Sequence, residues 1–154
     1  MADEVIEGLK SKFGGAILDV YERSPARTYI TVDPERLPDI AEYLYKDLGC
    51  RFSIASGMHM AQAIEILYHF PLDAAHRFLN LRVILDPDKP AVESLASRVP
   101  ATEWIEREIH ELLGVEFKNH PDMRHLLLAD DWPAGSHPLR KDWKDPEGGD
   151  NGQE

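Results

Sequence analysis

The chain has 154 residues, of which 43% are hydrophobic and 29% charged, as expected for one globular domain with a single core. Its 17 basic and 28 acidic residues give a formal net charge of -11, which argues against a nucleic-acid binder, because phosphate contacts need a basic surface. The one cysteine, Cys50, excludes an internal disulfide, a cysteine zinc site and a self-contained iron–sulfur cluster. No apolar run approaches the roughly 20 residues of a membrane span, so we expect any membrane contact to go through a partner.

The first third of the chain predicts a helix, a hairpin and a second helix. Asp3–Phe13 carries apolar residues at helical spacing and is followed by two glycines. Residues 17–23 and 27–32 are predicted strands, and the intervening Ser24-Pro25-Ala26 favours a β-hairpin. Pro38–Leu48 is predicted as an amphipathic helix that ends at Gly49.

Three further strands and two helices are predicted in the middle of the chain. Apolar and polar residues alternate weakly over residues 52–54 and strongly over 64–70 and 79–85, and short links favour antiparallel pairing. A short helix is expected over residues 92–99 and a longer one from Thr102 to Gly114. The order αββαβββαα predicts an α+β two-layer sandwich, with helices on one face of a mostly antiparallel or mixed five-stranded sheet.

The end of the chain lacks this periodicity. Residues 116–143 contain three prolines and many charges, and a structureless segment of this length in a compact domain is usually functional or disordered. Its apolar residues, Leu126–Leu128 and Trp132, are poorly suited to a free tail. We therefore expect residues 1–115 to form the α+β domain and residues 116–143 to form an extended arm, the C-terminal arm, that lies on another protein. Residues 144–154 are expected to be disordered.

One sequence motif suggests a metal site but lacks an essential ligand. His110-Glu111-Leu112-Leu113-Gly114 begins like the His-Glu-x-x-His helix of zinc proteases, whose two histidines share one helical face. Gly114 stands where the second histidine would be and cannot bind a metal. The histidines of the arm also match no zinc spacing. The sequence therefore predicts no metal site.

The same helix carries charged residues that allow two interpretations. Glu106, His110 and Glu111 could serve as acid–base groups of a free-standing hydrolase, but no nucleophile motif accompanies them. Glu103, Arg107 and Glu111 follow at intervals of four, which predicts a solvated ladder of ion pairs, each worth about 0.2–0.5 kcal/mol. We favour the ladder. A third class, an unrelated adaptor with an exposed binding arm, also fits the pattern.

An ordered series of short motifs, beginning with Trp104-Ile105-Glu106-Arg107-Glu108 and Glu111–Phe117, resembles a known family. The series continues with His120-Pro121-Asp122-Met123-Arg124, Leu126–Leu128, Asp131-Trp132 and His137–Trp143. It is similar to the 30 kDa subunit of respiratory complex I, which is the C subunit of bacterial NADH–quinone oxidoreductase. The family includes the equivalent subunit of energy-converting membrane-bound nickel–iron hydrogenases, to which Glu111, Leu113 and the short chain also point.

The resemblance implies a non-catalytic structural and assembly subunit in the peripheral arm of a complex-I-like NADH–quinone oxidoreductase. Its implied partners are the large quinone-site or hydrogenase-like subunit and the small cluster-binding subunit, on the cytoplasmic side of the membrane. The chain itself would bind no cofactor and have no activity alone. NAD, flavin, iron–sulfur clusters, and the quinone or nickel–iron centre would belong to partner subunits.

The resemblance also implies which residues contact the partner. By position they are Glu106, Arg107, Gly114, Phe117, His120, Pro121, Asp122, Arg124, Asp131, Trp132, His137, Pro138, Leu139, Arg140, Lys141 and Asp142. Among these, Arg140 offers a planar fork suited to a partner carboxylate. We expect the arm to be mobile without its partner and Arg140 to matter for assembly rather than folding.

Overall fold

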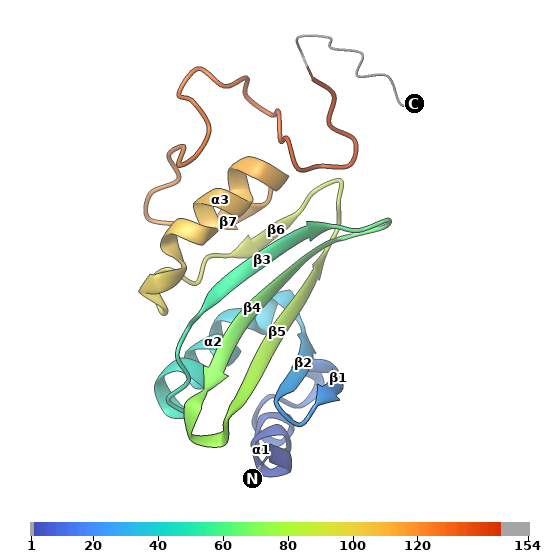
Figure 1. The fold of residues 1–154 in the computed structure, drawn as a ribbon, viewed down its shortest axis with the longest axis vertical. Helices are drawn as coiled ribbons and strands as arrows, with labels where there is room; N and C mark the ends of the chain where they lie inside the picture. The colour runs from blue at the N-terminus through green and yellow to red at the C-terminus, as the bar shows by residue number, and fades with distance from the viewer. Residues whose placement is uncertain (1, 146–154) are drawn as a thin grey trace.

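A computed structural model describes residues 2–145, and its centre is a five-stranded mixed sheet (Figure 1). The strands are β1 (Ile17–Ser24), β2 (Arg27–Val32), β3 (Ile54–His59), β4 (Ile64–Leu72) and β5 (Arg77–Leu85). They lie in the order β1-β2-β5-β4-β3. Strand β2 runs parallel to β5, whereas the other neighbouring pairs are antiparallel. The predicted α+β class and five-stranded mixed sheet are therefore confirmed.

Helices cover one face of this sheet. Helices α1 (Ala2–Phe13) and α2 (Leu37–Glu42), the latter continued by η3 (Tyr43–Asp47), lie behind the sheet in Figure 1. Short 3-10 turns connect the elements: η1 (Gly14–Ala16), η2 (Pro34–Arg36), η4 (Asp73–Ala75) and η5 (Pro100–Thr102). Alternate side chains of β4 and β5 face these helices and form the core, together with Ile30, Leu37, Ile40 and Leu44, all fully buried.

Helix α3 (Glu103–Leu113) packs against edge strand β3, and a glycine permits the close approach. A Cβ atom built on Gly57 would lie 2.7 Å from Leu113 Cδ1 and 3.2 Å from Ile109 Cγ2. A larger residue at position 57 would force the side chain of Leu113 to shift and would crowd that of Ile109. The sheet and the last helix therefore behave as one packed unit.

The predicted helix over residues 92–99 is wrong. Residues Ala91–Glu93 form strand β6, which pairs in parallel with β7 (Glu116–Lys118), so that the buried side chains of Val92 and Phe117 lie opposite each other. Three residues with a buried central side chain fit a helix as well as a strand. What decides for a strand is the pairing with β7, which lies more than twenty residues later in the chain. Strand β7 falls inside the range expected for the C-terminal arm, and residues 146–154 of the expected disordered tail lie outside the described residues.

Candidate partner-binding surface

Helix α3 holds the C-terminal arm through a buried carboxylate. Glu111 accepts hydrogen bonds from the backbone amides of Leu126 at 3.0 Å, Leu127 at 2.6 Å and Leu128 at 3.4 Å, and from His125 Nδ1 at 3.2 Å. Burial would raise the pKa of Glu111, but the donated hydrogen bonds outweigh burial and lower it. The arm therefore surrounds a charged carboxylate with its own amide groups.

Arg107 binds the same segment one helical turn earlier. Its Nε donates to the carbonyl oxygen of Arg124 at 2.9 Å, and its Nη2 donates to that of His125 at 2.6 Å. The predicted ladder of solvated ion pairs is wrong, because Arg107 and Glu111 are buried and bind the backbone of the arm rather than each other. His120 adds a third contact between the arm and α3, because its Nε2 lies 2.9 Å from the carbonyl oxygen of Glu103.

Glu106 lies on the inner side of the same helix. It is fully buried and accepts hydrogen bonds from Ser94 Oγ and from the amide of Leu95, the latter at 2.7 Å. Burial raises the pKa of Glu106 and outweighs these hydrogen bonds and nearby His120, which act to lower it. Glu106 therefore stabilises the turn after β6.

The three residues of the hydrolase alternative do not form one reaction site. Glu106 binds the turn after β6, Glu111 binds the arm, and His110 Nδ1 lies 2.8 Å from the carbonyl oxygen of Val115. Each polar group thus has a structural partner in a different part of the chain. This arrangement gives no support to acid–base catalysis by these residues.

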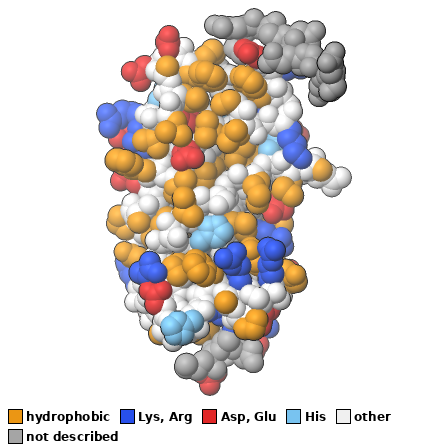
Figure 2. Space-filling view, in the orientation of Figure 1, with side chains coloured by type: hydrophobic (Ala, Val, Ile, Leu, Met, Phe, Trp, Pro, Cys, Tyr) orange, Lys and Arg blue, Asp and Glu red, His pale blue; other side chains and the backbone are white. Residues whose placement is uncertain are grey.

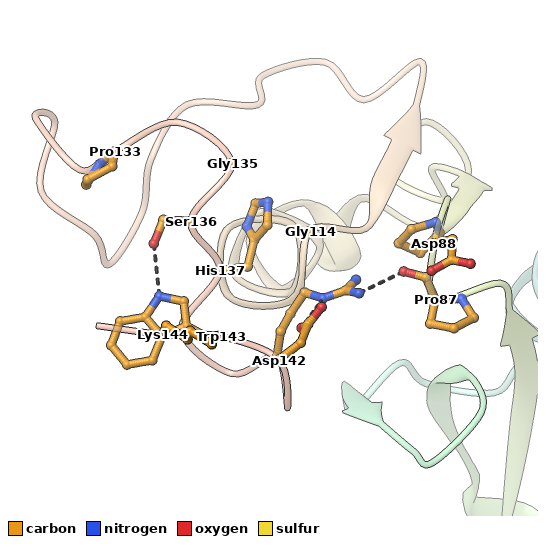
Figure 3. Close-up of a pocket in the computed structure, with 12 residues that line it drawn as sticks. Pro87, Asp88, Gly114, Pro133, Gly135, Ser136, His137, Asp142, Trp143 and Lys144 are labelled. Atoms are coloured by element: carbon orange, nitrogen blue, oxygen red, sulfur yellow. Dashed lines mark hydrogen bonds and ion pairs between the residues drawn. The ribbon is translucent and has the colours of Figure 1, made fainter. Parts of the chain in front are cut away.

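The end of α3 is capped by the arm at Gly114. Gly114 has φ of +75°, and an added Cβ would lie 2.6 Å from Cδ2 of His137, which lies beside it in Figure 3. Nδ1 of His137 lies 2.9 Å from the carbonyl oxygen of Glu111, and the amide of Leu139 donates to that of Leu112 at 2.9 Å. These donors pair with carbonyls of the last helical turn, which have no intrahelical partner.

Arg140 fastens the arm to the loop after β5. Its Nη2 donates to the carbonyl oxygen of Pro87 at 2.8 Å, and its Nε donates to Asp142 at 3.0 Å. The fork expected to meet a partner carboxylate is thus used within the chain. Nearby, Trp143 Nε1 donates to Ser136 Oγ at 2.9 Å, and these residues border a hollow of about 700 Å3 (Figure 3).

The predicted contact residues fall into two groups. Residues that support the fold or the attachment of the arm are Glu106, Arg107, Gly114, Phe117, His120, Asp122, Trp132, His137, Pro138 and Arg140, all buried or half-buried. Residues exposed on the surface are Pro121, Arg124, Asp131, Leu139, Lys141 and Asp142. Even in this group, Arg124 pairs with Asp122, and the amide of Lys141 donates to His59 Nδ1 at 3.0 Å.

An apolar patch beside the arm was not among the predicted contact residues. Trp104 is 67% exposed and Ile54 is 50% exposed, and Figure 2 shows hydrophobic side chains gathered over the part of the molecule where α3 and β3 lie. In the sequence, the hint of this patch is Trp104, which lies on the side of the predicted helix away from Ile109. Trp104 can be recognised as part of a patch only once the structure shows that β3 lies beside this helix.

The described part of the chain offers neither a metal site nor a membrane span. Within residues 2–145, no group of three His, Cys, Asp or Glu side chains is placed to hold a metal ion. Among the same residues, no helix combines the length and the apolar character needed to span a bilayer.

One known family matches most of the chain. Residues 30–147 match the family described as "Respiratory-chain NADH dehydrogenase, 30 Kd subunit". The C subunit of the F(420)H(2) dehydrogenase of Methanosarcina mazei is 36% identical, with 93% of this chain and 92% of that protein covered. Hydrogenase-4 component G of Escherichia coli is 33% identical over 93% of this chain, but the chain spans only 26% of that protein's length. A chain in the structure of an archaeal membrane-bound sulfane sulfur reductase shares the fold, with a TM-score of 0.75 at 20% identity over 95% of this chain and 87% of that one.

Proposed function

Because the chain belongs to the family of the 30 kDa subunit of respiratory-chain NADH dehydrogenase, we propose that it is a non-catalytic assembly subunit of a complex-I-like oxidoreductase. In this proposal it packs against the large quinone-site subunit in the peripheral arm, on the cytoplasmic side of the membrane. The observation that carries the proposal is the arm fixed along α3 beside an exposed apolar patch. Such a patch, flanked by polar groups, is typical of a protein–protein interface.

The lengths of the relatives support a large partner. Hydrogenase-4 component G is about four times as long as the region it shares with this chain. The C subunit of the F(420)H(2) dehydrogenase, by contrast, is matched over 92% of its own length. A domain that is joined to a larger protein in one relative and separate in another commonly binds the corresponding larger chain. A large subunit is therefore the partner that best fits the patch.

We propose that the redox cofactors lie in partner subunits. These would be NAD, flavin, iron–sulfur clusters, and quinone or a nickel–iron centre. Cys50, the one cysteine, is buried, and burial together with the charge of Asp73 raises the pKa of its thiol to about 11. A thiol with so high a pKa is a poor metal ligand, because metals bind the thiolate.

A second candidate is the equivalent subunit of an energy-converting nickel–iron hydrogenase. It is favoured by the 33% identity to Hydrogenase-4 component G. The two candidates share the same role for this chain and differ in the electron donor and acceptor of the complex.

The test is purification of the tagged chain from mild-detergent extracts of membranes of cells that make the complex. The proposal predicts equal amounts of this chain, a large subunit and a small cluster-binding subunit, and no activity in the isolated chain. NADH–quinone activity of the purified complex would select the first candidate, and hydrogen uptake would select the second. Recovery of the tagged chain without other subunits would contradict both.

A further inference from the structure

A groove runs between α3 and the outer edge of β3. Two adjoining hollows of about 280 and 240 Å3 share Ile54, Ile105 and Glu108 as lining residues. Most other side chains along the groove are apolar, and Trp104 and Leu139 extend its walls. A lining that is mostly apolar is typical of the centre of a protein–protein interface, which favours side chains of a protein as the occupants.

One charged group interrupts this apolar lining. Glu108 lines both hollows and is half-buried, and its carboxylate makes no hydrogen bond or ion pair with any residue in the described part of the chain. A protein seated on the groove would remove this carboxylate from water. The loss of solvation is costly unless the occupant supplies a cation, so the groove selects a basic side chain between apolar ones.

The groove is already formed in the chain without a partner. The floor of the groove is held by the close contact between Gly57 and Leu113. One wall is held by the amide of Leu139, which donates a hydrogen bond to the end of α3. A preformed surface loses little conformational entropy on binding, which favours high affinity for a small contact area.

We propose that this groove binds a segment of the large partner subunit in which apolar residues flank one Arg or Lys that pairs with Glu108. The inference rests on the proposed function and deepens it by naming the binding surface on this chain and the chemistry of the partner segment. A second copy of this chain is a poor occupant, because a net charge of -11 on each copy opposes self-association. Trp104 fits the role of an aromatic anchor at the rim of the groove.

The first experiment measures how much of the chain is recovered with the co-expressed, tagged large subunit. Glu108→Lys is expected to lower recovery at least tenfold, and Glu108→Gln less, because Gln does not repel a cation. Glu7→Lys on α1, at the opposite end of the molecule in Figure 1, is the matched control and should be recovered like the wild type. Thermal melting of each free variant shows that it is folded. Restoration of Glu108→Lys by an Arg→Glu or Lys→Glu change in the partner would identify the paired residue.

The second experiment replaces Trp104 with photoreactive benzoylphenylalanine and maps the cross-linked peptide. A peptide of the large subunit that contains Arg or Lys is expected, whereas the same replacement at Tyr21, on the opposite edge of the sheet, should give none. Normal recovery of Glu108→Lys, or a cross-link between two copies of the chain, would overturn the groove proposal and leave the proposed function standing. Failure of the wild-type chain to bind the large subunit would overturn the proposed function itself.

Discussion

Replacing Glu111 with alanine is expected to loosen residues 126–128 of the C-terminal arm from α3 without unfolding the sheet. The carboxylate holds the amides of Leu126 and Leu127 at 3.0 and 2.6 Å. Hydrogen bonds to a charged group contribute about 1.5–3 kcal/mol each. The lower value applies here, because Leu127 is 62% exposed and water can therefore approach its freed amide. Two such bonds give about 3 kcal/mol, or roughly a hundredfold increase in opening of the arm.

Amide hydrogen exchange measures this opening residue by residue. In Glu111→Ala, exchange at Leu126 and Leu127 should be about a hundredfold faster than in the wild type. Exchange in β4 should change little. Glu116→Ala, which alters an exposed carboxylate on β7, is the control and should leave both regions unchanged. Unchanged exchange at residues 126–128 in Glu111→Ala would refute the claim that the carboxylate holds the arm.

Acid should loosen residues 126–128 of the arm in the same way. The hydrogen bonds to the carboxylate hold the pKa of Glu111 below its ordinary value of 4.5, even though burial acts in the opposite direction. A lowered pKa in the folded chain contributes stability that is complete above about pH 4.5 and is lost as the pH falls through the folded value. Exchange at Leu126–Leu128, corrected for the intrinsic rate, should therefore rise below pH 4.5 in the wild type. A flat profile between pH 6 and pH 3 would contradict this prediction. The pKa of Glu106 is raised, so its effect on stability as the pH falls is opposite in direction. Glu106 contacts the turn after β6 rather than the arm, and this effect is therefore separate.

Three further predictions concern single positions. Arg140→Ala should speed exchange at Leu139 about tenfold, because the bond to Pro87 is lost, while the stability measured by thermal melting should change by less than about 1 kcal/mol. An equal loss of local and of global stability would contradict a local role for Arg140. Gly114→Ala should destabilise the chain by about 1–2 kcal/mol in thermal melting, because of its positive φ and the clash with His137, and a neutral result would refute that geometry. Cys50 should resist thiol reagents at pH 8 in the folded chain and react on unfolding, because its pKa is raised to about 11; fast labelling of the folded chain would disprove its burial.

The sequence predicted those parts of the fold that depend on local patterns. The strict alternation over residues 64–70 specifies one buried face, and this strand lies inside the sheet between β5 and β3. The Ser24-Pro25-Ala26 link likewise placed the first hairpin correctly. Strand β6 escaped prediction because Val92 is paired by Phe117, which is distant in the sequence.

The attachment of the arm could not be predicted from local spacing. Arg107 and Glu111 are four residues apart, which is also the spacing of a surface ion pair. Their partners are backbone groups of residues 124–128, and backbone donors and acceptors leave no mark in a sequence. The same is true of Arg140, which binds the carbonyl of Pro87. The resemblance pointed to this segment as the partner-binding one, and the structure shows that many of its side chains bind within the chain itself.

The most direct test of assembly is deletion of the chain in cells that make the complex, followed by measurement of the large subunit in the membrane fraction. We expect the large subunit to leave the membrane fraction or to be degraded. The wild-type chain should restore it, and Glu7→Lys should do so equally well. Full retention of an active, membrane-bound complex without this chain would contradict its role as an assembly subunit.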